Sequence, residues 1–224
     1  MEVSTPVALE ARDLYRFYHA GDDETLALRG VSLTIAAGEV VAVMGPSGSG
    51  KSTLLACLAG LDDPDGGTVR IAGAPMSRRP EQERTRLRAH SIGILFQSVN
   101  LIQHLTVEGN VLVAQRLGGE SDRGRAARLI QSVGLAARAH AYPSTLSGGE
   151  GARAGLAVAL ANDPAVLLAD EPTGEVDGEN AKEMMGLLRS RANDGGAVVI
   201  VTHNEAVAAA ADRVVRLLDG RIAA

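Results

Sequence analysis

Short apolar runs recur along this chain, and stretches with helical periodicity separate most of them. Alternating apolar and polar residues at 7–11 and 28–35, on either side of a polar turn at 21–24, predict an antiparallel β flap. Later apolar runs predict further strands at 40–44, 68–72, 92–96, 165–169, 197–201 and 214–218. Because helical stretches connect most of these runs, we expect an α/β fold with a parallel sheet covered on both faces.

Between Gln97 and Leu160 the pattern changes to mostly helical periods, such as 125–133. Breaks fall at Gly118-Gly119 and at Tyr142-Pro143. We therefore expect one domain over residues 1–224. Residues 1–97 and 161–224 would form its catalytic core, and residues 98–160 an inserted α-helical subdomain.

A glycine-rich loop follows the strand expected at 40–44, and an apolar helix follows the loop. The loop fits the pattern G-x-x-x-x-G-K-[ST], in which backbone N–H groups and a helix N-terminus surround a triphosphate. Lys51 would place its charge between the β- and γ-phosphates, and Ser52 would ligate Mg²⁺. A glycine turn without function seldom has this context. The predicted ATP-binding residues are Gly45, Pro46, Ser47, Gly48, Ser49, Gly50, Lys51, Ser52 and Thr53.

Lysine is scarce in this chain, which has 22 basic residues but lysine only at Lys51 and Lys182. A lysine kept within the loop indicates that a compact ammonium is needed where a planar guanidinium would collide with phosphates. Neither lysine lies in an Asn-Lys-x-Asp loop, so the sequence does not read as that of a GTPase.

A net charge of −5 argues against a surface that binds nucleic acid along its length. The arginines at 78–88 alternate with Glu81 and Glu83, as on a solvated helix.

Cys57 lies among apolar residues, which is typical of a core position in a reducing compartment. No leader pattern opens the chain and no apolar run reaches the length of a membrane span. We expect a cytosolic protein whose membrane role requires a separate partner chain.

Two adjacent carboxylates, Asp170 and Glu171, end the apolar run at 165–169. Neighbouring positions on a strand point in opposite directions. Asp170 would therefore reach the Mg²⁺ beside Ser52, while Glu171 would turn towards the γ-phosphate and polarise a water molecule. The alternative, a simple strand cap, is weakened by the phosphate loop upstream and by Pro172-Thr173-Gly174 downstream.

The stretch Leu146-Ser147-Gly148-Gly149-Glu150 precedes another apolar helical run. Ser147 would cap that helix, with Glu150 closing a capping box. A serine with two exposed N–H groups at a helix N-terminus also binds anions. No phosphate is expected nearby in the same chain, which suggests a phosphate supplied by another subunit.

With these motifs in this order, the chain resembles the ATPase subunit of an ABC transporter, a P-loop NTPase with a RecA-like core, over essentially its whole length. The resemblance implies that Gln97 is the switch glutamine near Mg²⁺ and the membrane partner. It further implies that His203 senses the γ-phosphate and that Asp177 lies in the loop that crosses the dimer. Ser147, Gly148 and Gly149 would then contact ATP from the facing subunit.

Three aromatic residues, Tyr15, Phe17 and Tyr18, precede the first turn. Tyr15 and Phe17 would share a strand face and pack inward, leaving Tyr18 to present its ring. In the family an aromatic residue at this place stacks on adenine, so we expect Tyr18 to do so. An ordinary strand aromatic is the alternative.

The run at 96–102 and Leu105-Thr106-Val107 look most like the subgroup of macrolide exporters, lipoprotein-release machines and the cell-division complex. The chain departs from the family pattern at Gly151, Ala152, Gly155 and Glu175. A helix glycine costs about 1 kcal/mol relative to alanine. The departures therefore bear on dimer affinity and turnover rate.

We expect two copies, most simply a homodimer, to sandwich two ATP molecules and to hydrolyse them to ADP and phosphate. Lys51 and Mg²⁺ would neutralise developing charge, and Glu171 would activate water. Closure would drive a membrane permease, for export or extraction, at the inner face of the cell membrane. A mechanical or signalling adaptor that moves no solute stays open. A soluble ABC ATPase of DNA repair or translation is disfavoured because only the 49 residues at 98–146 are available for an arm.

Overall fold

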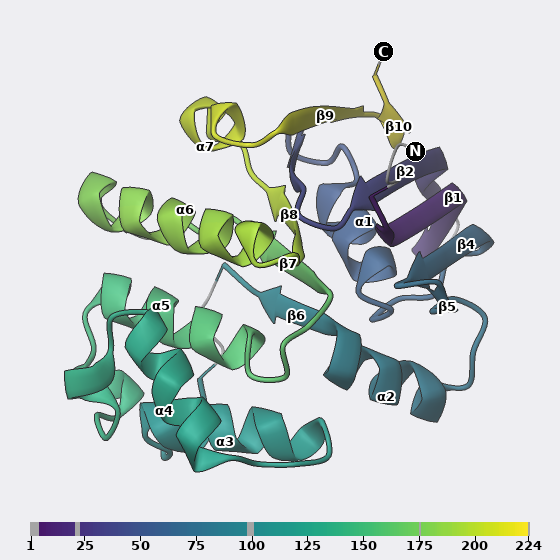
Figure 1. The fold of residues 1–224 in the computed structure, drawn as a ribbon. Coiled ribbons are helices and arrows are strands. Elements are labelled where there is room, and N and C mark those ends of the chain that lie inside the picture. The colour runs from purple at the N-terminus through teal and green to yellow at the C-terminus, as the bar shows by residue number, and fades with distance from the viewer. Residues whose placement is uncertain (1–4, 21–22, 98–100, 175, 224) are drawn as a thin grey trace.

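The computed structural model describes residues 5–20, 23–97, 101–174 and 176–223. These residues form two sheets and a group of helices (Figure 1). The smaller sheet is antiparallel, with strand order β2-β1-β4-β5. Its strands are β1 (Val7–Ala20), β2 (Asp23–Ala36), β4 (Gly66–Ile71) and β5 (Ala74–Pro75). The antiparallel flap predicted from the first forty residues is confirmed.

The larger sheet has strand order β10-β9-β3-β8-β7-β6. Its strands are β3 (Val40–Met44), β6 (Ile92–Leu95), β7 (Val166–Asp170), β8 (Ala197–Val201), β9 (Arg213–Leu218) and β10 (Arg221–Ile222). Every pairing from β9 to β6 is parallel, and only β10 runs antiparallel to its neighbour. The predicted parallel sheet is therefore confirmed.

Strand β4 differs from the expectation that the apolar runs after the flap build the parallel sheet. It pairs antiparallel with β1, so the run at 68–72 belongs to the smaller sheet. Val69 and Ile71 are buried while Thr68 and Arg70 are exposed. This alternation is typical of a strand with one solvated face, whereas strands of a covered parallel sheet are apolar throughout.

Strands β7 and β8 show why the runs of the parallel sheet are continuous. Val166 and Leu168 join one apolar cluster, and Leu167 and Ala169 join another. The first cluster also contains residues of the antiparallel sheet and of α1 (Lys51–Leu58), and the second contains residues of the helices on the other face. Each central strand is thus covered on both sides, which requires apolar residues at successive positions.

The remaining α-helices lie mostly on the face of the larger sheet opposite to α1 (Figure 1). They are α2 (Glu81–Ser91), α3 (Val107–Leu117), α4 (Arg123–Ser132), α5 (Gly148–Ala159), α6 (Gly178–Asn193) and α7 (Glu205–Ala209). Helices α3, α4 and α5 contact one another, and α5 also packs on β6 and α6. None of the helices in the described ranges combines the length and the apolar character that a membrane crossing requires.

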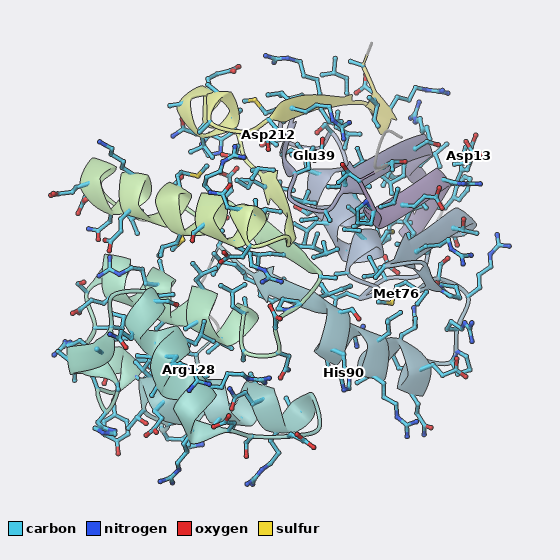
Figure 2. All side chains as sticks on the ribbon, viewed as in Figure 1. Asp13, Glu39, Met76, His90, Arg128 and Asp212 are labelled. Atoms are coloured by element: carbon cyan, nitrogen blue, oxygen red, sulfur yellow. The ribbon has the colours of Figure 1, made fainter. Side chains whose placement is uncertain are left out.

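Carboxylates fix the amino ends of the central strands. Asp212 accepts a hydrogen bond from Val40 N–H (2.8 Å) and pairs with Arg189 (2.8 Å), while Glu39 pairs with Arg213 (2.9 Å). Figure 2 labels both acids near the start of β3. Arg189 and, after it, the Val40 N–H hold the pKa of Asp212 below its usual range. The strand ends opposite to these anchors carry the residues described next.

Candidate functional site

The glycine loop connects β3 to α1, and its surroundings require glycine. Gly50 has a φ of +101°, a left-handed conformation that favours glycine. A Cβ on Gly45 would collide with the carbonyl oxygen of Leu217 and approach Ser49 Oγ to 2.6 Å. Gly220 N–H donates to the carbonyl oxygen of Ser49 (3.0 Å), so the β9-β10 turn supports the loop from outside. No local sequence pattern indicates this long-range support.

Helix α1 begins without a side-chain cap. Its first backbone hydrogen bond runs from Leu54 N–H to the carbonyl oxygen of Gly50 (2.8 Å). The N–H groups of residues 51–53 come before that bond, so they have no carbonyl partner within the helix. Lys51 Nζ donates to the carbonyl oxygens of Gly45 (2.7 Å) and Pro46 (2.9 Å). The cation is therefore held over the loop, beside N–H groups that can bind an anion.

A cavity of about 440 Å³ lies over this loop, which is within the usual range for a nucleotide-sized ligand. The flap and the β9-β10 turn form its other walls. Seven of the predicted ATP-binding residues line it, namely Tyr18, Ser47, Gly48, Gly50, Lys51, Ser52 and Thr53. Ser49 is buried instead, and its Oγ has no hydrogen-bond partner within the described part of the chain.

The aromatic residues of β1 do not follow the simple alternation that was expected. Tyr18 lines the cavity and is 40% exposed, but Tyr15 is also 40% exposed and does not pack in the core. The β1-β2 register shifts between Leu14 and Tyr15 and again between Arg16 and Phe17, which breaks the two-residue period. The Tyr15 ring lies against Gly30 and Gly66. The inward packing predicted for Tyr15 is wrong for this reason.

Asp170 and Glu171 stand at the carboxyl end of β7. Glu171 has a φ of +46°, which is strained for a residue with a long side chain. Its carboxylate accepts hydrogen bonds from Thr202 Oγ1 (3.0 Å) and from the backbone N–H of His203 (3.0 Å), and it lies 2.7 Å from His203 Nδ1. The structure thus brings Glu171 and His203 together. Thr202, which is fully buried, was not identified from the sequence.

The charge environment of Asp170 bears on whether Mg²⁺ could bind at this end of the sheet. No group of three or more His, Cys, Asp or Glu side chains among the described residues could hold a metal ion by itself. Burial and then the neighbouring Glu171 raise the pKa of Asp170, whereas Lys51 lowers it. A cation beside Ser52 and Asp170 would relieve this unfavourable negative charge, with phosphate oxygens completing its shell.

The signature motif, Leu146-Ser147-Gly148-Gly149-Glu150, lies apart from Lys51. Ser147 and Gly148 line a separate hollow of about 200 Å³ together with Gln97 and Glu171. The predicted capping box of α5 is confirmed: Ser147 Oγ accepts from Glu150 N–H (3.2 Å), and Ser147 N–H donates to the Glu150 carboxylate (2.8 Å). Ser147 N–H, and after it Arg138, hold the pKa of Glu150 below its usual range.

Asp177 caps α6 by accepting from the N–H groups of Glu179 (3.1 Å) and Asn180 (3.0 Å). Asn180, which sequence reasoning missed, also donates to Asp177 (2.9 Å) and accepts from Arg153 of α5 (2.9 Å). Its amide fills the space where Gly149 would carry a Cβ. Asn180 therefore connects the loop of Asp177 to the signature helix.

The unusual glycines of the signature do not interrupt α5, which runs through Gly151, Ala152 and Gly155. Glu175 lies outside the described residues. Cys57 is buried, as expected, and burial raises its pKa to about 12. It is therefore a core residue rather than a reactive thiol.

Comparisons with known proteins agree with the motifs. The ABC transporter family model matches residues 28–174. The macrolide export ATP-binding/permease protein MacB of Shigella flexneri is 44% identical over 221 residues, and MacB of Escherichia coli strain K12 is 43% identical over the same length. These matches cover 97% of this chain but 34% of each relative, so the chain spans about a third of their length.

Solved structures show the same fold. The dimeric bacterial ABC transporter cassette MJ0796 superposes with a TM-score of 0.89 at 36% identity, covering 96% of this chain and 97% of that one. A post-hydrolysis dimer of MJ0796 bound to ADP and Pi gives the same values. The chain therefore belongs to the ABC transporter family, as an ATP-binding cassette that hydrolyses ATP to ADP and phosphate.

Proposed function

We propose that two copies of this cassette bind two ATP molecules between them and that hydrolysis separates the copies. The observation that carries the proposal is the position of the two anion-binding helix ends. Lys51 stands in the 440 Å³ cavity, and Ser147 stands in a different hollow of the same chain. No described residue lines both cavities, so we infer that a second chain supplies Ser147, Gly148, Gly149 and Asp177.

Within each half-site, Ser52, Asp170 and Gln97 would hold Mg²⁺. When bound, this ion neutralises charge that develops on the phosphates. Glu171 orients and polarises the attacking water, because its carboxylate is fixed by Thr202 on one oxygen and by His203 on the other. His203, whose side chain is 78% exposed, is accessible to the γ-phosphate from the same position.

The test is the oligomeric state of a variant that cannot hydrolyse ATP. Glu171→Gln preserves shape and removes the charge, so we expect a monomer without nucleotide, a dimer with ATP and little turnover. Adding Ser147→Arg should return the protein to a monomer, because the cation and its bulk block the facing phosphate. Size-exclusion chromatography with light scattering measures both states.

Ser132→Arg is the matched control, since Ser132 is an exposed serine at the end of α4 that lines neither the cavity of Lys51 nor the hollow of Ser147. It should leave the ATP-dependent dimer intact. A Glu171→Gln protein that binds ATP yet stays monomeric, alone and mixed with any co-purifying cassette, contradicts the shared site.

We further propose that the cassette powers a separate membrane permease from the cytoplasmic face of the membrane, for export or extraction. The relatives' printed name joins an ATP-binding part to a permease part, and this chain matches only the ATP-binding third. A groove of about 330 Å³ between α2, α3 and α5 contains residues of both the sheet core and the helical region. At its edge Leu117 is 74% exposed. A permease segment bound in this groove would be displaced when the sheet core and the inserted helices move relative to each other.

The alternative is a mechanical or signalling adaptor that moves no solute. The site residues are the same for both functions, so the membrane partner decides between them. Affinity purification of the chain from its native membranes identifies that partner. A multi-span channel favours transport, and a protein with few spans and a large domain outside the cell favours the mechanical function.

A further inference from the structure

One face of the Tyr18 ring is covered by a cation of the same strand. The guanidinium carbon of Arg16 lies 4.8 Å from the centroid of the ring, within the range of a cation–π contact. Both residues belong to β1, and this contact places their side chains next to each other despite the register shift between Arg16 and Phe17. A base that enters the cavity can therefore stack only on the opposite face of the ring.

The hydroxyl end of the ring is held as well. Tyr18 Oη donates to Asp62 Oδ2 (2.9 Å), and Arg16 Nε donates to the same oxygen (2.8 Å). Arg16 Nη1 pairs with Asp65 (3.0 Å), whose carboxylate also accepts from Phe17 N–H (2.7 Å). The fork of Arg16 thus bridges two acids while its plane lies over the ring. These contacts restrict both the tilt and the swing of an aromatic side chain that is 40% exposed.

The acids that hold the ring belong to the segment just after α1. This helix begins at the phosphate loop with Lys51 and ends at Leu58, and Asp62 follows after one turn. The backbone is tied at the same place, because Asp65 N–H donates to the carbonyl oxygen of Tyr15 (2.9 Å). The ring is therefore fixed relative to the element that carries the triphosphate-binding groups.

We propose that Arg16 and Asp62 are positioning residues that hold Tyr18 ready to stack on a purine base. A ring fixed in its binding orientation loses less conformational freedom when the base arrives, which raises affinity. The gain applies to the base and leaves the triphosphate contacts unchanged. This inference rests on the proposed stacking role of Tyr18.

Calorimetric titration with two probes separates the base from the phosphates. ATP reports on both, and inorganic tripolyphosphate reports on the loop alone. Arg16→Met keeps the apolar stem and removes the fork, so we expect ATP affinity to fall about fivefold. Tripolyphosphate affinity should stay within about twofold of the unmodified protein. Asp62→Asn should give a smaller loss in the same direction.

Arg12→Met is the matched control, since Arg12 is an exposed arginine of the same strand that pairs with Glu10. It should change neither affinity. Arg16→Lys keeps a charge near Asp62 but lacks the fork, so it should restore only part of the ATP affinity. Because a global loss of structure weakens both probes, selective loss for ATP distinguishes positioning from a merely structural role.

Tyr18→Ala separates the failure of this inference from the failure of the stacking proposal. If Tyr18→Ala leaves ATP binding unchanged, stacking itself is refuted. If Tyr18→Ala weakens ATP binding while Arg16→Met and Asp62→Asn do not, stacking stands and the positioning role is refuted. In the double variant Arg16→Met/Tyr18→Ala, we expect the effect of Arg16→Met to disappear, because no ring remains to be held.

Discussion

Helices α1 and α5 both begin at glycine-rich turns, but their N-termini are satisfied in different ways. The first residue before α1, Gly50, offers no side-chain acceptor, and its neighbour Lys51 is a cation. The first turn of α5 carries the Ser147-Glu150 capping box instead. The N-terminus of α1 is therefore available to an external anion, whereas the N-terminus of α5 is capped by side chains of its own chain.

The same chain therefore contains two kinds of helix terminus that can contact phosphate. The α1 terminus adds a cation to its N–H groups, so it can bind triphosphate alone. The α5 terminus contains the acid Glu150, which Arg138 balances at 3.1 Å. A phosphate there meets no spare cation in the described contacts. Its binding therefore depends on a phosphate already held by another chain, which agrees with the proposed ATP-dependent dimer.

The largest effect is expected at α1. Lys51→Arg should weaken ATP binding about 100-fold, because Lys51 Nζ fits between two loop carbonyls where a planar guanidinium does not. The melting temperature should change little. Lys182→Arg, at the other lysine of the chain and exposed on α6, is the control. Calorimetric titration decides the matter, and tight ATP binding by Lys51→Arg would remove the special role given to the ammonium.

The next effect concerns the glycines of the two termini. Gly50→Ala and Gly149→Ala should each cost about 2 kcal/mol of unfolding free energy through overpacking. At Gly50 the new Cβ meets the backbone oxygen of Ala27, while at Gly149 it meets the side chain of Asn180. Adding Asn180→Ala should therefore restore part of the stability of Gly149→Ala. Denaturant unfolding measures this, and additive losses in the double variant count against the contact.

Ser147→Ala should have a smaller effect, about 1 kcal/mol of unfolding free energy, because it removes a helix cap. ATP binding by the single chain should not change, since Ser147 lies outside the cavity of Lys51. The ATP-dependent dimer of the Glu171→Gln background should weaken. If Ser147→Ala reduces nucleotide affinity of the monomer, the two termini are not independent and the comparison fails.

The smallest effect is a pH dependence of the α5 cap. The folded state lowers the pKa of Glu150, so its stabilising contribution is fully present above the unfolded pKa and is lost as pH falls through the folded value. The difference in unfolding free energy between the unmodified protein and Glu150→Gln should therefore shrink below about pH 4.5. Urea unfolding at several pH values measures it. A difference that grows in acid would reverse the assigned sign.

Sequence alone determined the local features of this protein. The buried strands, the phosphate loop, the capping box of Ser147 and the order of the motifs all depend on residues within a few positions of one another. The alternation at 68–72 also carried a usable signal, because its polar positions indicate a half-solvated strand rather than one of the parallel sheet.

The contacts that position these local features form only when the chain folds. Asn180 meets Gly149, Asp62 holds Tyr18, and Thr202 holds Glu171, in each case across dozens of residues of chain. The bulges that turn Tyr15 outward depend on the pairing of β1 with β2. Periodicity and propensity describe neighbours along the chain, whereas these pairings follow from how twisted strands and packed helices meet in space. A single sequence contains no local record of that geometry.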